Sequence, residues 1–252
     1  MSATLAVLEY HLVGYRRLWR ASVLSSFVLP LLTMVGFGIG VGAYVTGGVD
    51  GVPYLDWMVP GLIASTAMQI AISESTWPVL GGFEWRRVYF GQADAPLRIA
   101  DIIGGHLLFV LLRALLGGCA FLAVAAVFGT LHSWWALACG PIAVLVGLSV
   151  ATPTFAYAAS VSTDSYLAIL MRIGVLPMSL FSGVFFPVDQ LPVVLRWVAY
   201  LLPLWHGVDL SRAATLGVAP EWSVTGHLLY LAAWGVAGWW LATRAFSRRL
   251  VV

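Results

Sequence analysis

The stretch that decides the fold is residues 102–128, IIGGHLLFVLLRALLGGCAFLAVAAVF, in which Arg113 is the only charged residue. A helix over these residues is about 40 Å long at 1.5 Å per residue, whereas the hydrocarbon core of a bilayer is about 30 Å thick. The stretch is therefore predicted to cross a membrane. Five further runs are long and apolar enough to do the same: residues 21–45, 58–80, 134–161, 166–186 and 224–243.

The composition of the chain indicates the same class of protein. Of its 252 residues, 61% are hydrophobic and 10% are charged, whereas soluble domains carry roughly 25% charged residues. The sequence therefore predicts an all-α polytopic membrane protein with a single transmembrane domain over residues 1–252. A net charge of +2 is too small to indicate a nucleic-acid partner.

All 13 basic residues are arginine, and this has a consequence for ATP. The Gly-rich loop that grips nucleotide phosphates ends in a lysine, so this chain cannot contain one. If ATP powers the protein, another chain hydrolyses it, and no cofactor is expected here. The use of arginine alone, with many Ala, Gly and Val residues, indicates a GC-rich bacterial genome and hence the plasma membrane.

The arginines also determine the predicted orientation, because short cytoplasmic loops retain basic residues. Six crossings place three groups on the same side: Arg16, Arg17 and Arg20; Arg86, Arg87 and Arg98; Arg244, Arg248 and Arg249. Both termini are therefore expected in the cytoplasm. Residues 188–202 lie between Pro187 and Pro203 and contain Pro192, so we expect them to lie in or dip into the outer face without crossing.

Residues 4–20 are predicted to form an amphipathic helix before the first span. Leu8, Leu12, Tyr15 and Trp19 fall on one stripe, and the opposite side carries Glu9, Arg16, Arg17 and Arg20. This pattern is typical of a helix in the cytoplasmic interface, with its apolar stripe in lipid and its arginines toward phosphates. Such a helix serves either as a topological anchor or as a docking element for a partner.

The loop after the second span combines aromatic residues with charges of both signs. Its predicted short helix, residues 83–90, contains Phe83, Glu84, Trp85, Arg86, Arg87, Tyr89 and Phe90. Aromatic residues beside arginine are enriched in the hot spots of protein interfaces. The loop is therefore predicted to be a docking surface, the alternative being a solvated turn.

Three further segments carry a resemblance to a known family. Residues 181–192, FSGVFFPVDQLP, are followed by residues 203–212, PLWHGVDLSR, and residues 94–97, DAPL, follow the charged loop. With the amphipathic N-terminal helix, these motifs resemble ABC-2 type permeases over essentially the whole chain. Within that family the chain looks most similar to nodulation lipo-oligosaccharide exporters and related drug-export permeases.

The resemblance implies a six-helix exporter subunit that pairs with a like or unlike second permease. It also implies two cytoplasmic ATPase subunits, which bind ATP and magnesium. Residues 83–90 would be the coupling helix, and residues 188–212 a re-entrant pair of outer helices. The outer or gate residues would then be Phe186, Pro187, Asp189, Pro192, Pro203, His206, Asp209 and Arg212. Drug, lipid and lipo-oligosaccharide cargo all remain open.

Charged residues inside spans need a partner or an aqueous cavity, because each costs about 2.5–3.5 kcal/mol at bilayer depth. Glu74 is expected to pair with Arg113 or Arg172, and His106 shares one helical face with Arg113. These residues either fix helix register or line the cytoplasmic half of the transport route. His206 is expected to bond Asp209 or a backbone carbonyl, with gating as the alternative.

Two other functions compete with this interpretation. A proton-coupled transporter could use Glu74 and the arginines as a relay, although no inverted repeat is visible. An intramembrane hydrolase would need Ser149 as nucleophile with His106 or His227 as base, but Ser149 lies within a smooth apolar run without a nearby acid. Dependence of transport on ATP separates the first alternative from an ABC exporter, and a Ser149→Ala variant tests the second.

Overall fold

The computed structural model describes residues 2–17, 19–42, 44–45, 47–49 and 51–250, with side chains except at Trp19, residues 21–26, Leu29 and Ile39. Within these residues the backbone is helical apart from turns and one isolated bridge between Val49 and Val52. The elements are α1 (Ala3–Arg16), α2 (Trp19–Met34), η1 (Val35–Val41), α3 (Tyr54–Ser75), α4 (Trp77–Glu84), α5 (Val88–Ala93), α6 (Ile99–Val127), η2 (Trp134–Ala138), α7 (Cys139–Ser160), α8 (Asp164–Ile169), η3 (Leu170–Val175), α9 (Leu176–Phe181), η4 (Val188–Gln190), α10 (Val193–Leu201), α11 (Pro203–Leu216) and α12 (Val224–Leu250). The prediction of an all-α chain is confirmed.

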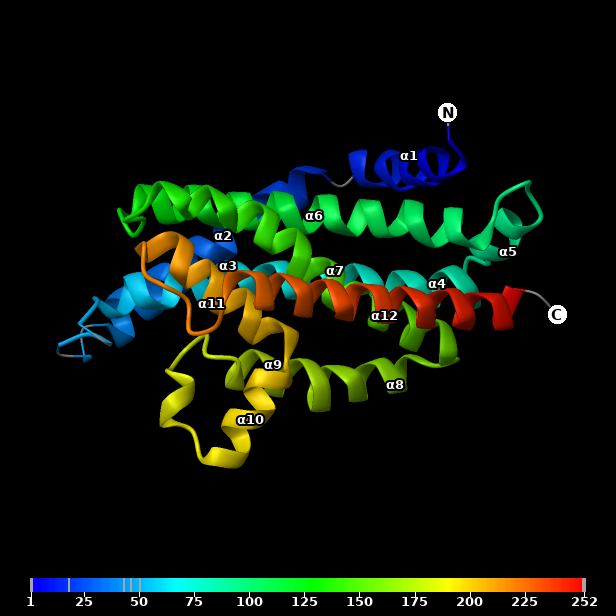
Figure 1. The fold of residues 1–252 in the computed structure, drawn as a ribbon. Helices are drawn as coiled ribbons and strands as arrows, with labels where there is room; N and C mark the ends of the chain where they lie inside the picture. The colour runs from blue at the N-terminus through cyan, green and yellow to red at the C-terminus, as the bar shows by residue number, and fades with distance from the viewer. Residues whose placement is uncertain (1, 18, 43, 46, 50, 251–252) are drawn as a thin grey trace.

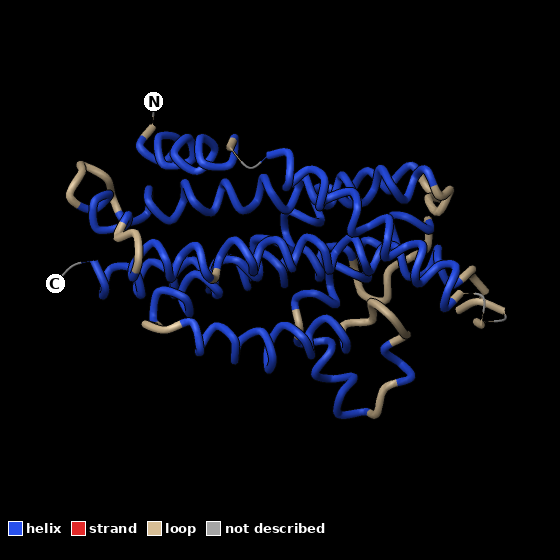
Figure 2. Tube along the Cα trace, turned by 180° about the vertical axis from the view of Figure 1, so that it is seen from behind, coloured by secondary structure: helices blue, strands red, loops and turns tan. Residues whose placement is uncertain are grey.

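The long helices lie side by side along one axis. Figure 1 shows α3, α6, α7 and α12 in the body of the bundle, with α1 along α6 on one flank and α8, α9 and α10 on the other. Figure 2 shows the same arrangement from behind. Helix α7 is central because it packs against α3, α6, α11 and α12. The start of α1, the short helix α5 and the end of α12 lie at the same end of the bundle (Figure 1).

Small residues bring the central helices close together. On α12, Gly238 lies against Thr152 and Pro153 of α7, and Gly235 lies against Leu148. A side chain at either glycine would overlap these neighbours. Lipid tails are as apolar as leucine, so helices associate in a membrane through close van der Waals contact of this kind.

Four helical stretches among the described residues are long and apolar enough to cross a membrane. They are Tyr54–Glu84, Ile99–Val127, Trp134–Ser160 and Asp164–Phe181. They coincide with the predicted spans at 58–80, 102–128, 134–161 and 166–186, which makes this a multi-pass protein. The stretch Tyr54–Glu84 is interrupted at Thr76, whose φ of −101° and ψ of −91° separate α3 from α4.

The predicted first and sixth spans are not among these four stretches and fall on other helices. Residues 21–45 fall on α2 and the π-helix η1, and residue 43 of that range lies outside the described part of the chain. Helix α12 extends to Leu250, beyond the predicted end at residue 243. At 27 residues it is about 40 Å long, more than the hydrocarbon thickness of a bilayer.

The fifth predicted span ends earlier than the sequence suggested. Helix α9 stops at Phe181, because the chain turns at Gly183, where φ is 75°. Phe186 and Pro187 therefore lie in the connection to η4 and outside the helix. This stretch contains the π-helix η3, in which the wider turn includes Arg172.

The segment expected to lie on the outer face is divided into separate short helices. Pro192 precedes α10 and Pro203 begins α11, because the fixed φ of proline favours the first turn of a helix. Helix α10 has nine residues, too few to cross a bilayer. Its Trp197 is exposed, whereas nearly all of the first half of α11 is buried.

Candidate functional site

The loop after the second predicted span is a sharp turn between two short helices. Helix α4 ends at Glu84, and α5 begins at Val88. Arg87 between them has a φ of 50°, the only positive value at a non-glycine residue among those described. A left-handed residue ends a helix and redirects the chain. The prediction of one helix over residues 83–90 is therefore wrong, because the helix is interrupted between Glu84 and Val88.

The turn has an exposed tip and a buried base. Glu84, Arg86 and Arg87 are exposed, and Trp85 retains 64% of its accessible surface. Phe83 and Tyr89, which were expected on the docking surface, are each only 2% exposed. We call Glu84–Arg87 the exposed tip. Phe90 is half-buried beside it.

Aromatic packing fixes the base of the turn to the bundle. The ring of Phe83 lies 4.7 Å from that of Tyr89 and 4.9 Å from that of Phe246 on α12. Offset and edge-to-face ring contacts at such distances stabilise a fold by about 0.5–1.5 kcal/mol beyond area burial. Phe83 and Tyr89 therefore position the exposed tip and are not available to a partner.

Arg249, at the end of α12, connects three helix ends. Its Nη1 donates to the carbonyls of Ala159, at 2.8 Å, and Val161, at 2.9 Å, and its Nη2 pairs with the Glu84 carboxylate. The guanidinium also lies 4.4 Å from the centre of the Phe83 ring. Sequence reasoning used Arg249 only for orientation, because nothing local in the sequence places it beside α4.

Helix α1 packs along α6. Thr4 Oγ1 donates to Asp101 Oδ1 at 2.7 Å, and Val7 lies against Gly105. Further along, Tyr15 Oη accepts a hydrogen bond of 3.0 Å from Arg113 Nη1. The contacts advance along both helices, so α1 runs parallel to the first half of α6.

This arrangement corrects the predicted interface helix. Leu8, Leu12 and Tyr15 are half-buried on the side of Val7, the one buried residue of α1, and not on the exposed side. Arg16 and Arg17 are exposed. The helix ends at Arg16, and Trp19 and Arg20 belong to α2. An amphipathic stripe identifies the side of a helix that packs, but not whether protein or lipid covers it.

The structure pairs two of the three charged residues expected inside spans. Arg113 Nε on α6 donates to Glu74 Oε1 on α3 at 3.2 Å, and the guanidinium lies 4.7 Å from the centre of the Tyr15 ring. The expected alternative partner, Arg172, is exposed on η3. Both members of the pair are half-buried. The ion pair therefore joins α3 to α6 beside the N-terminal helix.

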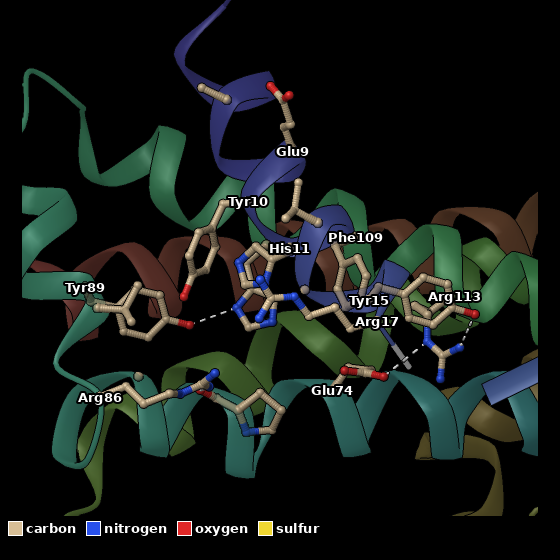
Figure 3. Close-up of a pocket in the computed structure, with 17 residues that line it drawn as sticks. Glu9, Tyr10, His11, Tyr15, Arg17, Glu74, Arg86, Tyr89, Phe109 and Arg113 are labelled. Atoms are coloured by element: carbon tan, nitrogen blue, oxygen red, sulfur yellow. Dashed lines mark hydrogen bonds and ion pairs between the residues drawn. The ribbon is translucent and has the colours of Figure 1, made fainter. Parts of the chain in front are cut away.

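A cavity of about 840 Å³ lies between α1, α4 and α6. Figure 3 shows Glu9, Tyr10, His11, Tyr15 and Arg17 along one wall, with Arg86 and Glu74 opposite them. The cavity therefore lies between the N-terminal helix, the exposed tip and the ion pair.

Two imidazoles stack at the back of this cavity. The rings of His11 and His106 are 4.1 Å apart, and His106 Nδ1 shares a hydrogen bond of 2.8 Å with Tyr89 Oη. Burial, with a smaller contribution from the Arg86 charge, lowers the pKa of His11 to about 4. His11 is therefore neutral at physiological pH and can lie against a second imidazole without charge repulsion. No sequence signal identified His11, because its partner is on another helix.

The predicted outer residues fall into exposed and buried groups. Asp189 and Pro192 are exposed and Phe186 and Pro187 are half-buried, whereas Pro203, His206 and Asp209 are buried. Arg212 donates from Nη2 to the Gly183 carbonyl at 2.8 Å and stacks 4.0 Å above the Trp57 ring. It therefore joins α11 to α3 and to the turn after α9.

Two partners were expected for His206, Asp209 or a backbone carbonyl, and the structure shows the carbonyl. Its Nε2 bonds the Tyr200 carbonyl at 3.0 Å, and its Nδ1 lies 2.8 Å from Nδ1 of His227. Asp209 instead lies 2.9 Å from His227 Nε2 and accepts the Glu221 backbone N–H at 2.9 Å. The sequence left His227 without a role, since it lies 21 residues from His206 and shares no motif with it.

Comparison with known proteins assigns the chain to a family. Residues 2–216 match the ABC-2 type transporter family. Nodulation protein J of Rhizobium leguminosarum bv. viciae is 32% identical over 248 residues, which cover 98% of this chain and 95% of that protein. Nodulation protein J of Rhizobium meliloti (strain 1021) is 30% identical over 247 residues, covering 98% and 94% respectively. The chain belongs to the ABC-2 type transporter family.

Proposed function

We propose that the chain is the permease subunit of an ATP-binding-cassette exporter that moves an amphipathic substrate out of a bacterial cytoplasm. Family membership supports transport across a membrane. The absence of lysine from the sequence supports a separate ATPase, since the phosphate-binding loop of such an enzyme needs one. Drug, lipid and lipo-oligosaccharide remain the cargo classes of this proposal.

The observation that carries the proposal is the exposed tip Glu84–Arg87 on its buried base. Trp85 is 64% exposed and two arginines follow it, whereas Phe83 beneath the tip is 2% exposed. A partner that binds the tip can move the bundle only if the tip cannot fold away from it. Phe83, Tyr89 and Arg249 provide that attachment, because they tie the turn to α12 and α7.

The proposed topology has six spans, with α2 and η1 as the first and α12 as the sixth. The N-terminal helix, α5 and the C-terminal end of α12 lie at one end of the bundle (Figure 1), which is compatible with two cytoplasmic termini in the inner membrane. Residues 188–212 then form the outer re-entrant helices at the opposite end.

A second permease, identical or homologous, completes the proposed transporter. The stretch Asp164–Phe181 is apolar enough to cross a membrane, yet only 6% of its most apolar window is buried within the chain. A spanning helix that its own chain covers so little faces lipid or another protein. This exposed spanning stretch supports a paired permease.

The alternatives receive less support from the same residues. Ser149, the only nucleophile considered for a hydrolase, is fully buried and donates its hydroxyl to the Val146 carbonyl at 2.8 Å. Glu74, the carboxylate considered for a proton relay, is bound to Arg113 at 3.2 Å. Both groups therefore have structural partners.

The test is co-purification with an ABC ATPase co-expressed with this chain. We expect Trp85→Ala to lose the ATPase from a pull-down and to abolish ATP-driven export of a fluorescent amphiphile from inside-out vesicles. The matched control is Trp134→Ala, since Trp134 on η2 is 92% exposed and lies outside the tip. Unchanged binding and export in Trp85→Ala, or export without any ATPase, would contradict the proposal.

A further inference from the structure

Four groups from three helices form a chain of polar contacts at the end of the bundle opposite α5 (Figure 1). The Tyr200 carbonyl at the end of α10 lies 3.0 Å from His206 Nε2 on α11. His206 Nδ1 lies 2.8 Å from His227 Nδ1 on α12, and His227 Nε2 lies 2.9 Å from Asp209 Oδ2, again on α11. The contacts therefore run from α10 through α11 to α12 and back to α11. We call Tyr200, His206, His227 and Asp209 the outer cluster.

The outer cluster is closed off from solvent. Both imidazoles are 0% exposed and Asp209 is 6% exposed. The Tyr230 ring stacks on His206 with 3.9 Å between centroids, and the Trp222 ring lies 6.1 Å from that of His227. A buried polar atom that lacks a partner costs about 1–3 kcal/mol, so the protons of this cluster must be arranged to satisfy its atoms.

Counting protons shows that two neutral imidazoles and an ionised carboxylate do not suffice. A carbonyl only accepts, so His206 carries its proton on Nε2 and presents a bare Nδ1 to His227. His227 must then carry its proton on Nδ1 to complete the 2.8 Å contact. Its Nε2 is left bare, 2.9 Å from a carboxylate oxygen and without any hydrogen bond of standard geometry. Two electron-rich atoms would face each other in a buried site.

We propose that the outer cluster is a proton-binding site: one additional proton lies between His227 and Asp209 and fastens α12 to α11. The proton makes His227 an imidazolium beside a carboxylate, or makes Asp209 a neutral acid that donates to Nε2. In both forms the net charge of the two imidazoles and the carboxyl group is zero, and without the proton it is −1. Asp209 Oδ2 also accepts the Glu221 N–H, which favours the ionised carboxylate and hence the imidazolium.

Other charged and titratable groups surround the cluster. Burial, and next the Asp209 charge, raise the pKa of the Glu221 carboxyl, which therefore adds negative potential only when it ionises. Arg212 on α11 is engaged by the Gly183 and Trp57 carbonyls, and Arg196 on α10 bonds the Asp189 backbone carbonyl. The phenol of Tyr230 donates to the Leu201 carbonyl at 2.7 Å. None of these contacts provides a hydrogen for His227 Nε2.

The site is independent of the proposed ATPase, so it can be tested on the chain alone in lipid nanodiscs. Nitrogen-15 NMR of labelled histidines distinguishes an imidazolium, with two protonated nitrogens, from a neutral ring. At pH 8 an exposed imidazole, with a pKa near 6.5, is almost entirely neutral. We expect one imidazolium signal at this pH that is lost in Asp209→Asn. The infrared band of a protonated carboxyl, also lost in Asp209→Asn, would support the same site with the proton on oxygen.

The matched control is His132→Gln, which removes an exposed imidazole 2.8 Å from the Asp56 carboxylate. We expect it to leave the signal unchanged. The proposal is overturned if the wild-type protein at pH 8 shows neither an imidazolium nor a carboxyl band. It is also overturned if the signal survives Asp209→Asn or disappears in His132→Gln. Should Asp209→Asn fail to fold, the wild-type and His132→Gln spectra still decide, because the absence of both signals there is sufficient.

Discussion

Arg113 on α6 donates from Nε to Glu74 Oε1 on α3 at 3.2 Å, and from Nη1 to the hydroxyl of Tyr15 on α1 at 3.0 Å. One guanidinium thus joins the N-terminal helix to two helices that are apolar enough to cross the membrane. The same pair lines the cavity beneath α1. Its position allows it to fix the register of α3 against α6 and to respond when α1 moves.

Glu74→Gln and Arg113→Gln are each expected to destabilise the protein by about 1–3 kcal/mol, less than a fully buried pair because both side chains are half-buried. Each single change leaves an uncompensated charge, so the double variant should recover part of the loss. Thermal unfolding of the four proteins in nanodiscs measures this coupling. Purely additive losses would contradict a direct pair. Assays of ATP-driven export on the same variants test whether the pair also lines the route.

The Arg249→Gln variant is expected to unfold at a lower temperature than the wild type. It is also expected to stimulate ATP hydrolysis by the partner ATPase less than the wild type does. It removes two hydrogen bonds to carbonyls at the end of α7, those of Ala159 and Val161, and the ion pair to Glu84. Hydrogen bonds from charged groups contribute about 1.5–3 kcal/mol each before solvent screening. The control is Arg248→Gln, because Arg248 is exposed one residue earlier and a surface change of this kind stays within about 0.5 kcal/mol. Thermal unfolding and stimulated ATP hydrolysis are the measurements. Equal effects of the two variants would exclude a specific role for Arg249.

His11 makes the docking of α1 sensitive to acid. Its pKa in the folded protein is about 4, below the usual 6.5, because of burial and then of the Arg86 charge. The unfolded chain therefore binds a proton more readily, so stability is complete above pH 6.5 and falls as the pH drops toward 4. The loss reaches about 3 kcal/mol at most.

His11→Phe is expected to flatten this pH dependence, because a phenyl ring can keep the stacking against His106 without titrating. Unfolding temperatures measured at pH 7 and at pH 4.5 should differ less in this variant than in the wild type. His132→Gln, which changes an exposed imidazole, should leave the difference intact. A wild-type protein whose unfolding temperature is the same at both pH values would show that His11 is not buried as described.

Much of the bundle can be predicted from the sequence, because few backbone structures can cross a bilayer. A lipid core requires every backbone group to be bonded internally, so a long apolar run such as residues 102–128 forms a helix. The helix starts at Pro192 and Pro203 could also be predicted, since proline is favoured in the first turn of a helix. Depth along the helices placed Glu74 level with Arg172 and Arg113 nearer the midplane, so the sequence did not single out the Glu74–Arg113 pair that the structure shows.

The remaining features depend on contacts between residues far apart in the chain. The stripe of Leu8, Leu12 and Tyr15 indicated one packing face, but only the structure shows α6 beneath it. The partners of His227 and Arg249 lie far from them in the sequence, and both residues acquire these partners when α12 packs against α7 and α11. The left-handed backbone at Arg87 has no sequence signal, because glycine is the residue that usually marks such a turn.

Glu221→Gln should stabilise the protein at neutral pH and not in acid. Burial, followed by the Asp209 charge, raises the pKa of Glu221 above the model-peptide value of 4.5. The folded state therefore binds this proton more tightly than the unfolded chain, and stability is lost as the pH rises through the pKa of the folded protein. A neutral glutamine removes that penalty, so its unfolding temperature should exceed that of the wild type at pH 7 and converge with it near pH 4. Glu9→Gln, the same change at an exposed carboxylate on α1, is the control, because Glu9 is not among the charges that raise the pKa of Glu221. A Glu221→Gln variant that is less stable than the wild type at pH 7 would mean that the ionised carboxylate has a favourable partner, and the electrostatic description of this end of the bundle would then be wrong.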